Sequence, residues 1–421
     1  MGFQAASRSN YKLRHVTHRL SATSLDDSSD SGQIKLPKQL KKKALTTFPR
    51  YLEIECWKRP ELRGLEPVLQ AVAEACKQIN RIVQRAQTDD VYGVAVDSTG
   101  KPLEENVQGE VQQKLDVLCN TIMMQAFCGS SCNIHSVASE EEDEPRCCAD
   151  VMVRFSQMCN ACSSWNLTCY SLHDGKNDSV FGQGEYIAVF DPIDGSKNID
   201  ASLPVGSIFG IYRTQPGKPV NAESFLQDGN SLVAAGYCLY SATTILVLTL
   251  GSGVDGFTLD PDVSRFLHTH QDIRVPSNGA IYSFNEANYN DFDEPVQKYL
   301  SALKHGSSSI KKRSTARYIG SMVADVHNVL INGGIYGYPR TLGNKEGKLR
   351  LLYESAPMAM IMEQAGGAGS TGSRRILDVK PKETHQRVPT FLGSIENVFE
   401  LDQFYKYYSD EQVIGNTSEQ L

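Results

Sequence analysis

The fold of this chain is decided by one stretch, Glu185-Tyr-Ile-Ala-Val-Phe-Asp-Pro-Ile-Asp-Gly-Ser-Lys-Asn-Ile-Asp200, in which an apolar run stops at two aspartates three residues apart. Tyr186 to Phe190 is short, β-branched and aromatic, which predicts a buried strand. Asp191-Pro192 ends that strand, and Asp194-Gly195-Ser196 forms a turn. Two carboxylates therefore emerge together at the carboxyl edge of a sheet, where open α/β sheets bind their ligands.

The chemistry of this turn favours a site for metal ions and phosphate. A turn that contains glycine can aim successive backbone N–H groups at a phosphate. Mg²⁺ prefers one or two carboxylates together with phosphate oxygens. The stretch therefore predicts phosphate transfer to water. Asp-Pro and Asp-Gly are also ordinary turn formers at strand ends, so the motif alone leaves a purely structural role open.

The composition is that of an ordinary globular protein. The chain has 421 residues, of which 40% are hydrophobic and 22% charged, with a net charge of −7. This length has room for two or three domain-sized units or for one continuous assembly. Because there is no basic excess, no nucleic-acid partner is expected. Residues 229–254 carry no charge, but their β-branched residues favour two buried strands over a membrane span, so no membrane partner is expected either.

The N-terminal segment differs from the rest. Residues 1–46 are rich in Ser, Arg and Lys and poor in apolar residues, which predicts a disordered leader. The first 25 residues contain no acid, as is typical of an organellar transit peptide. The same composition suits a floppy tail without a targeting role, so both alternatives stay open.

Two helices are expected before the next acidic segment. Glu66 to Ala86 places its apolar residues at helical spacing, with Pro67 in the first turn. A polar, glycine-containing loop follows at residues 92–110, and then a second helix with one apolar face: Val111, Leu115, Leu118 and Ile122. Asp116 lies inside this helix, either as a solvated residue or as an inward ligand or base, and helical position cannot decide between them.

Further acids follow apolar runs. A predicted strand at Ile134 to Ser139 leads into Glu140-Glu-Glu-Asp-Glu144, and Glu354 follows the apolar run Leu349-Arg-Leu-Leu-Tyr353 as a third candidate strand end. An acidic run alone is usually a solvated loop. Taken together, the three sets of acids would supply oxygen ligands for more than one Mg²⁺.

The second half of the chain continues the alternation of strands and helices, which predicts a layered α/β architecture. Strands are expected at 205–212 and 281–286, and helices at 291–303, 322–331 and 357–364. A basic cluster, Lys311-Lys312-Arg313, precedes Arg317-Tyr318. Such a cluster is either solvated surface or a site for an anionic sugar phosphate.

From about Leu45 to Tyr405 the chain resembles the class I fructose-1,6-bisphosphatases, whose fold is shared with the inositol phosphatases. The resemblance is carried, in order, by Ser139-Glu-Glu141, Phe190-Asp-Pro-Ile-Asp-Gly-Ser196, Ala316-Arg-Tyr-Ile-Gly-Ser-Met-Val-Ala-Asp325 and Lys348-Leu-Arg-Leu-Leu-Tyr-Glu354. It implies a layered α-β-α-β sugar phosphatase fold with two α/β subdomains. The expected divisions are an N-terminal domain at 47–272, a C-terminal domain at 273–410 and a tail at 411–421.

The resemblance implies a role for each matching residue. The expected ligands of the catalytic Mg²⁺ ions, with Mn²⁺ or Zn²⁺ as substitutes, are Glu140, Glu141, Asp191, Asp194, Glu354 and the carbonyl of Ile193. Asp116 matches the residue that works with Glu141 to activate water. Glu110 stands where the family has an aspartate on its mobile active-site loop. Metals would neutralise the phosphoryl oxygens and generate hydroxide.

The substrate side follows in the same way. Residues matching those that hold the 6-phosphate are Asn285, Tyr318, Tyr338 and Lys348. Met322 and the turn Gly195-Ser196 would line the sugar and the 1-phosphate. Arg317 matches an arginine lent by a neighbouring subunit, so a homotetramer is expected.

The implied reaction is hydrolysis of fructose 1,6-bisphosphate to fructose 6-phosphate. Sedoheptulose-1,7-bisphosphatase, which shares the metal site, is the close alternative. A catalytically inactive sugar-phosphate-binding regulator is a further alternative, which the complete set of acids disfavours.

Two departures from the family concern charge. Lys197 occupies a position that is usually serine. In the animal enzymes an AMP pocket uses a Thr-Gly-Glu-Leu-Thr turn and a lysine before the core strand, whereas this chain has Leu62-Arg-Gly-Leu-Glu66 and Glu185. Because a glutamate repels the phosphate of a nucleotide, weak or absent inhibition by AMP is predicted.

Cysteine usage is the third departure. Of eleven cysteines, five fall in an expected insertion at about residues 143–182: Cys147, Cys148, Cys159, Cys162 and Cys169. The C-x-x-C at 159–162 is redox-active, half of a zinc site or a pair of inert thiols. Plant plastid relatives carry a thioredoxin-reduced disulfide in a loop that matches 214–230, which has no cysteine here.

A disulfide within the insertion is expected to pull on the segment between Glu141 and Tyr186 and to displace Glu140 and Glu141, with thioredoxin as the candidate partner. The leader, the lost AMP determinants and the thiols favour the chloroplast stroma over the cytoplasm, which stays an alternative.

Overall fold

The structure, a computed structural model, describes residues 45–95, 113–129, 133–161, 184–215 and 220–418. The predicted leader up to residue 44 lies outside these ranges, as do Glu110, Cys162 and Cys169. Within the described ranges, no helix combines the length and the apolar character that crossing a membrane requires.

The larger of two sheets contains the strand with Asp191 and Asp194 and the strand that precedes Glu140. Its eight strands follow the order β2-β1-β3-β4-β5-β6-β7-β8. They are β1 (Ile134–Ser139), β2 (Arg146–Cys147), β3 (Tyr186–Asp194), β4 (Val205–Arg213), β5 (Leu232–Tyr240), β6 (Thr244–Thr249), β7 (Asp255–Asp260) and β8 (Arg265–His270). β1 and β3 are parallel, and the other neighbours are antiparallel. The predicted central strand is therefore β3, and the uncharged run 229–254 forms two strands, β5 and β6, as expected.

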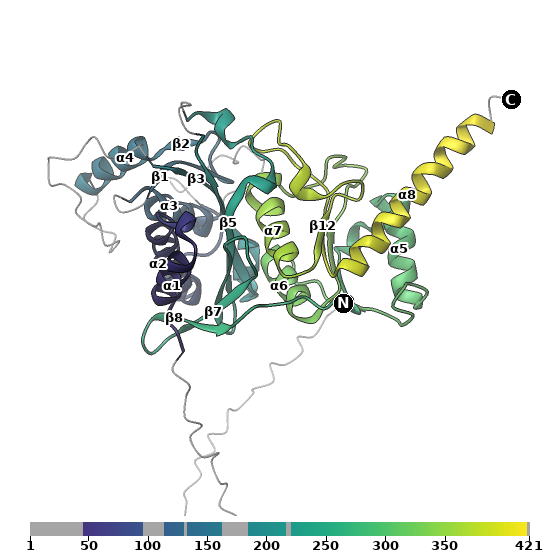
Figure 1. The fold of residues 1–421 in the computed structure, drawn as a ribbon, viewed down its shortest axis with the longest axis horizontal. Helices are drawn as coiled ribbons and strands as arrows, with labels where there is room; N and C mark the ends of the chain where they lie inside the picture. The colour runs from purple at the N-terminus through teal and green to yellow at the C-terminus, as the bar shows by residue number, and fades with distance from the viewer. Residues whose placement is uncertain (1–44, 96–112, 130–132, 162–183, 216–219, 419–421) are drawn as a thin grey trace, which may run out of the picture. The chain divides into compact units, whose positions relative to one another are not determined.

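Three helices cover one face of this sheet (Figure 1): α1 (Phe48–Lys58), α2 (Glu66–Arg85) and α3 (Lys114–Cys128). The apolar stripe predicted for 66–86 is buried on α2, and proline occupies its first turn. Phe127 of α3 packs on Phe190 of β3 with ring centroids 5.2 Å apart. This core fixes α3, which carries Asp116, against the strand that carries the two aspartates.

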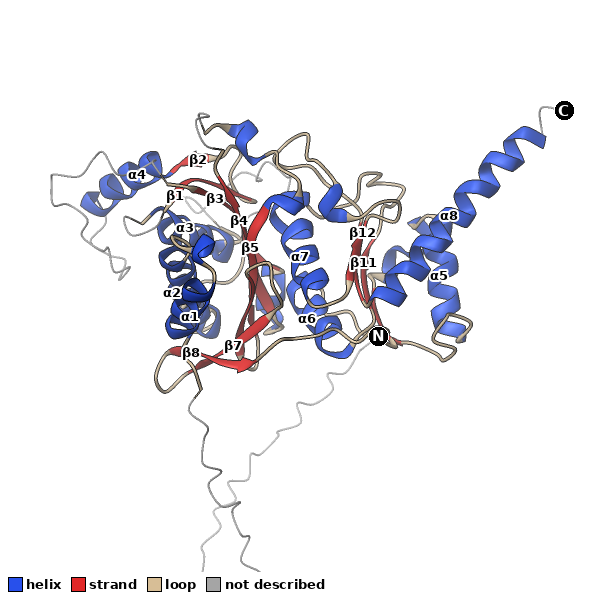
Figure 2. Ribbon diagram, in the orientation of Figure 1, coloured by secondary structure: helices blue, strands red, loops and turns tan. Residues whose placement is uncertain are grey.

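Helices α6 (Met322–Asn332) and α7 (Ala356–Gln364) lie between the large sheet and a smaller one (Figure 2). The smaller sheet has the order β10-β9-β11-β13-β12. Its strands are β9 (Ile281–Ser283), β10 (Thr315–Ala316), β11 (Ile335–Tyr338), β12 (Ala368–Ser370) and β13 (Thr390–Gly393). Helix α7 contacts β5 on one side and β12 on the other.

Helices α5 (Glu294–His305) and α8 (Ile395–Ser418) pack on each other and on the smaller sheet. Helices and sheets thus alternate as α-β-α-β, with α5 and α8 as a further layer. The predicted layered α/β fold is confirmed.

Three local predictions were wrong. Asp191-Pro192 does not end the central strand, because β3 continues through it to Asp194, which still pairs with β4 beyond a register shift. The strand expected at 281–286 stops at Ser283, because Asn285 accepts a hydrogen bond from the Ala287 N–H (3.3 Å) and caps a short helix at 286–291. Glu354 does not follow a strand: it lies in a π-helical turn, Leu351–Ser355, that leads into α7. The Ser355 N–H donates to the carbonyl of Arg350 (3.0 Å), which is the i to i−5 spacing of a π turn.

The segment expected as an insertion at 143–182 is partly regular structure. Its residues 146–161 form β2 and α4 (Cys148–Ala161). β2 pairs with β1, and α4 contacts α3 and β1. This part of the segment is therefore attached to the strand that precedes the acidic run.

Candidate active site

A bulge brings the two aspartates of β3 to one place. Residues three apart in a regular strand point to opposite faces of the sheet. Between Asp191 and Asp194 the register against β4 shifts, because Pro192 has no N–H to donate to the ladder. Asp191, Asp194 and Glu354 can then each bring a carboxylate oxygen within 4.8 Å of the others. Ile193, between the aspartates, donates its N–H to Asp191 Oδ1 (3.0 Å) and orients that carboxylate.

Asp194 is held at the N-terminus of α6. The Ser321 hydroxyl and the Val323 N–H (3.1 Å) both donate to Asp194 Oδ2, so the carboxylate lies at the positive end of a helix. Burial raises the pKa of Asp194 to about 6, although these two donors oppose the shift. Gly195 has a φ of 77°, and a Cβ there would lie 2.9 Å from the Ser321 Cβ, so the turn requires glycine.

Glu354 is oriented by Arg350, one helical turn earlier. The Arg350 N–H donates to Glu354 Oε2 (2.6 Å), and Nη1 of the same arginine lies 4.0 Å from this oxygen. Burial raises the pKa of Glu354 to about 7, while the Arg350 charge opposes the shift. This carboxyl is therefore harder to ionise than an exposed glutamate.

Glu140 joins the cluster from the end of β1. Its N–H donates to the carbonyl of Phe190 (3.0 Å), and its Oε1 lies 2.7 Å from Arg350 Nη1. Burial raises the pKa of Glu140 well above its usual value; Arg350 opposes the shift and the Glu141 charge adds to it. Burial also raises the pKa of Asp191, with the charges of Glu140 and Asp194 adding to the effect.

Three buried carboxylates, those of Glu140, Asp191 and Glu354, and the half-buried Asp194 thus gather here, and Arg350 pairs with two of them, Glu140 and Glu354. Such a set is costly to ionise without additional positive charge. Hard oxygen donors at this density fit a divalent cation of the Mg²⁺ type. The sequence prediction of a metal site is supported by this donor set.

Two further residues predicted for catalysis lie on the neighbouring elements. Glu141 is half-buried directly after Glu140, and its N–H donates to Ser139 Oγ (3.2 Å). Asp116 is 7% exposed, so it is not a solvated helix residue. Its carboxylate accepts the Gln113 N–H (2.7 Å) in a reciprocal cap at the start of α3.

Two of the predicted phosphate-binding residues share a cavity. Tyr338 and Lys348 line a cavity of about 260 Å³ together with Asn288, Asp291, Pro339, Thr341, Gly343 and Asn344. Burial is the largest effect on the pKa of Glu354 and raises it, while the charges of Arg350 and, more weakly, of Lys348 oppose that shift. Burial raises the pKa of Tyr318 to about 12 and the nearby Tyr338 adds to the shift.

The other predicted substrate residues are distributed around this region. Met322 is buried in the first turn of α6, directly after Ser321, whose hydroxyl donates to Asp194. Ser196 follows Gly195 and begins a short helix at 196–201, and Lys197 is exposed there. Asn285 and Arg317 lie outside the lining of the cavity, as far as the described residues show. Arg317 is exposed at the edge of the smaller sheet.

Both halves of the chain match models of one protein family. Residues 47–161 and 148–271 match the model "Fructose-1-6-bisphosphatase, N-terminal domain", and residues 275–406 match the model for the C-terminal domain. The chain belongs to the fructose-1,6-bisphosphatase family.

Chloroplastic fructose-1,6-bisphosphatases are among its relatives. The Brassica napus protein is 45% identical over 367 residues, which are 82% of this chain and 79% of the relative. The Spinacia oleracea protein is 44% identical over 355 residues, which are 80% and 76% of the two chains. These chloroplastic relatives support the plastid location that the leader predicts.

A solved structure of the family has the same fold. The holo form of Leishmania major fructose-1,6-bisphosphatase aligns with a TM-score of 0.72 at 35% identity, covering 86% of this chain and 99% of that chain. The resemblance drawn from the four sequence motifs is therefore confirmed at the level of family and fold.

Sequence reasoning overlooked two residues of this fructose-1,6-bisphosphatase site. Arg350 binds two of the acids, and Ser321 binds a third. Both had a signal: an arginine inside the apolar run 349–353 must be paired if it is buried, and a serine directly before a predicted helix is a typical N-cap.

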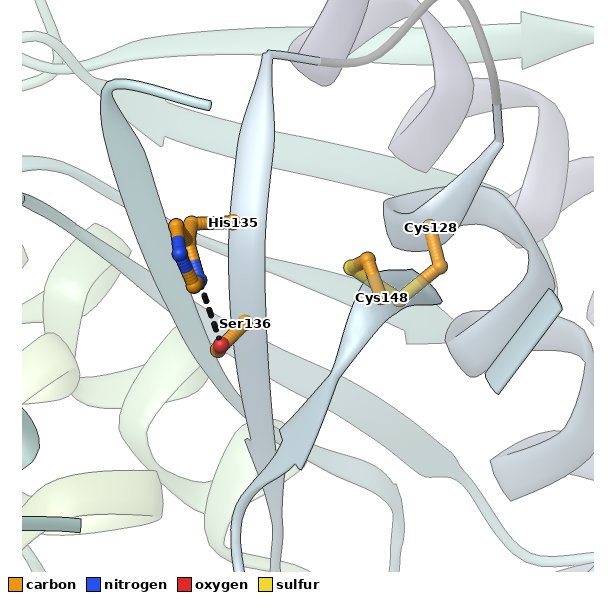
Figure 3. The surroundings of a disulfide bond; sticks show 4 residues. All are labelled: Cys128, His135, Ser136 and Cys148. Carbon is orange, nitrogen blue, oxygen red and sulfur yellow. Dashed lines mark hydrogen bonds between the residues drawn. A yellow bond between two sulfur atoms is a disulfide. The ribbon is translucent and has the colours of Figure 1, made fainter. Parts of the chain in front are cut away.

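The cysteine predictions have a mixed outcome. A disulfide joins Cys148 to Cys128, which lies outside the expected insertion at the end of α3 (Figure 3). Cys147 is a half-buried free thiol. Cys159 lies in α4, and Cys162 lies outside the described residues. The three alternatives for the C-x-x-C therefore stay open.

This disulfide is not the one for which a displacement of Glu140 was predicted, because only one of its cysteines lies in the insertion. With the bond formed, the Glu140 N–H keeps its hydrogen bond to the Phe190 carbonyl in the register of β1 and β3. The displacement of Glu140 and Glu141 expected from a disulfide within the insertion stays a prediction.

Proposed function

We propose that this chain hydrolyses the 1-phosphate of fructose 1,6-bisphosphate to give fructose 6-phosphate and phosphate, with Mg²⁺ as its cofactor and Mn²⁺ or Zn²⁺ as substitutes. The observation that carries the proposal is the convergence of Asp191, Asp194 and Glu354, whose carboxylate oxygens lie within 4.8 Å of one another. The names of the chloroplastic relatives and of the Leishmania major structure support the same reaction.

One group of residues would bind the metal ions and the 1-phosphate of the substrate. Asp191, Asp194, Glu354, Glu140, Glu141 and the carbonyl of Ile193 would hold divalent ions, which when bound neutralise phosphoryl oxygens and acidify a water molecule. The Gly195-Ser196 turn offers backbone N–H donors to the 1-phosphate.

At the other end, Lys348 and Tyr338 bind the 6-phosphate through a charge-assisted and a directional hydrogen bond, with Tyr318 and Asn285 as further donors. Met322 packs against the sugar. Asp116 and Glu141 take the proton of the attacking water. Glu110, which lies outside the described residues, would take the place of the family's aspartate on the active-site loop.

The same proposal includes assembly and regulation. Arg317, exposed directly after the edge strand β10, would reach the site of a neighbouring subunit in a homotetramer. The functional units would be residues 47–272 and 273–410, in line with the family-model matches. Glu185 lies 3.6 Å from Arg213 Nη1, and a glutamate at this position supports insensitivity to AMP.

The test is phosphate release from fructose 1,6-bisphosphate and from sedoheptulose 1,7-bisphosphate, each with Mg²⁺ and after chelation. Mg²⁺-dependent release that is faster from the fructose ester is expected. Preference for the sedoheptulose ester would change the substrate assignment, and no release from either would favour an inactive sugar-phosphate-binding protein.

A further inference from the structure

The acidic run after β1 carries a third glutamate that is bound by two other elements. Asn120 of α3 donates from Nδ2 to Glu142 Oε1 (2.9 Å). Arg146 of β2 donates from Nε (3.2 Å) and Nη2 (3.1 Å) to Glu142 Oε2. Each oxygen of this carboxylate is therefore held by a different element, and Glu142 joins α3 to β2.

The same hydrogen bonds continue to the predicted metal ligands. Ser139 Oγ donates to Asn120 Oδ1 (2.7 Å) and accepts the Glu141 N–H (3.2 Å). Ser139 and Asn120 are buried, so these bonds lie in a low-dielectric environment that strengthens and rigidifies them. From the other side, His385 Nε2 lies 3.1 Å from the Glu142 carbonyl oxygen. The backbone that carries Glu141 and Glu142 is thus fixed at several points.

The disulfide closes a loop around this arrangement. Cys128 ends α3, Cys148 begins α4, and their Cα atoms are 4.8 Å apart with a sequence separation of 20 (Figure 3). The closed loop contains β1, the acidic run and β2. β2 has only two residues, paired as Ser136↔Cys147 and Val137↔Arg146, and so short an edge strand is marginal by itself. Cys148, at one end of the bond, lies two residues after Arg146.

We propose that Glu142 is a positioning residue for the metal ligands Glu140 and Glu141, and that the Cys128–Cys148 disulfide keeps its Asn120–Arg146 clamp closed. The proposal rests on the proposed function only in taking these two glutamates as metal ligands. Reduction of the disulfide loosens β2, frees Glu142 and weakens the binding of divalent ions. The metal site is then most complete in the oxidised protein.

Opening the clamp is a thiol–disulfide exchange with an external dithiol. A thiolate of the dithiol attacks one sulfur of the Cys128–Cys148 bond, forming a mixed disulfide and releasing the other cysteine. The second thiolate of the dithiol then displaces the remaining protein sulfur. The dithiol gives up two electrons and becomes a disulfide, and the two cysteines take up two protons. Because both cysteines are buried, the exchange requires β2 and α4 to open locally.

The first test compares variants of the clamp in the full chain. Glu142→Ala and Arg146→Ala should each raise the Mn²⁺ dissociation constant, measured by equilibrium titration, about five-fold. They should raise the Mg²⁺ concentration for half-maximal activity similarly while kcat at saturating Mg²⁺ stays unchanged. Glu142→Gln keeps one oxygen acceptor, so its Mn²⁺ dissociation constant should lie between those of the two alanine variants and that of wild type. Asp143→Ala is the matched control, because Asp143 is the exposed neighbour in the same turn.

The second test compares the protein with its Cys128–Cys148 disulfide formed and broken. Dithiol-reduced wild type should bind Mn²⁺ about five-fold more weakly than the oxidised protein. By linkage, saturating Mn²⁺ must then lower the reduction potential of the disulfide by about 20 mV, since ten-fold corresponds to about 30 mV for two electrons. Amide exchange of residues 140–147 should quicken on reduction while that of α2 does not. Cys128→Ser should behave as the reduced protein, and Cys147→Ser as wild type.

Equal or tighter Mn²⁺ binding by the reduced protein, together with an unchanged potential, would overturn the proposal. Unaltered binding in Glu142→Ala would do the same. Failure of oxidised wild type to bind Mn²⁺ at all would instead contradict the proposed function, so the two failures are distinguishable.

Discussion

The buried acids make the stability of the metal-free protein fall as the pH rises. Glu354 has its pKa raised from 4.5 to about 7, chiefly by burial. Between these two values the folded state binds more protons than the unfolded state, so the free energy of unfolding decreases with pH across this window. A stabilisation present below pH 4.5 is thus lost by pH 7. For Glu354 alone the loss is about 3 kcal/mol, from about 1.4 kcal/mol for each pH unit.

The assay is urea unfolding of chelator-treated protein at a series of pH values from 5 to 8. Wild type should lose stability across this range, and Glu354→Gln should lose about 2.5 kcal/mol less, because the range begins above pH 4.5. Saturating Mg²⁺ should remove most of the loss in wild type, because a bound cation stabilises the ionised carboxylates. Asp262→Asn, an exposed acid in the turn between β7 and β8, is the control and should follow wild type. If metal-free wild type gains stability from pH 5 to pH 8, the description of the acid cluster is wrong.

Three further predictions concern the turn, the cavity and the effector. Gly195→Ala should destabilise the protein by about 2 kcal/mol in urea unfolding, because its φ of 77° and the 2.9 Å approach to Ser321 both disfavour a Cβ; an unchanged midpoint would refute this. Lys348→Met should raise KM for fructose 1,6-bisphosphate by about ten- to a hundred-fold with less effect on kcat, since a charge-assisted hydrogen bond contributes about 1.5–3 kcal/mol; an unaltered KM would remove Lys348 from the phosphate site. Micromolar AMP should leave activity unchanged, and inhibition at that concentration would contradict the role assigned to Glu185.

The sequence was most informative where local chemistry decides structure. The strand at 186–190 and the turn at Gly195 were predictable, because an apolar β-branched run followed by Asp-Pro and Asp-Gly has few alternative conformations. The two aspartates were predicted to emerge together, but the bulge that makes this happen depends on pairing with β4, which is a long-range property.

The remaining features depend on contacts between distant segments. Glu354 was a candidate ligand because it follows an apolar run, but that run was predicted to be a strand and its π turn was not visible in the pattern. Cys128 was not expected to pair with Cys148, since connectivity among cysteines cannot be deduced from spacing. The pairing of Arg350 with Glu140 and the binding of Glu142 by Asn120 and Arg146 likewise join segments that only the fold brings together.

The most direct test of the central claim is equilibrium binding of Mn²⁺ to the purified chain in the presence of inorganic phosphate, for wild type and for Asp191→Asn. Convergence of the acids from β1, β3 and the turn before α7 predicts saturable binding of more than one ion to wild type and a large loss of affinity in the variant. Identical titrations of the two proteins, or no saturable binding to wild type, would contradict the account.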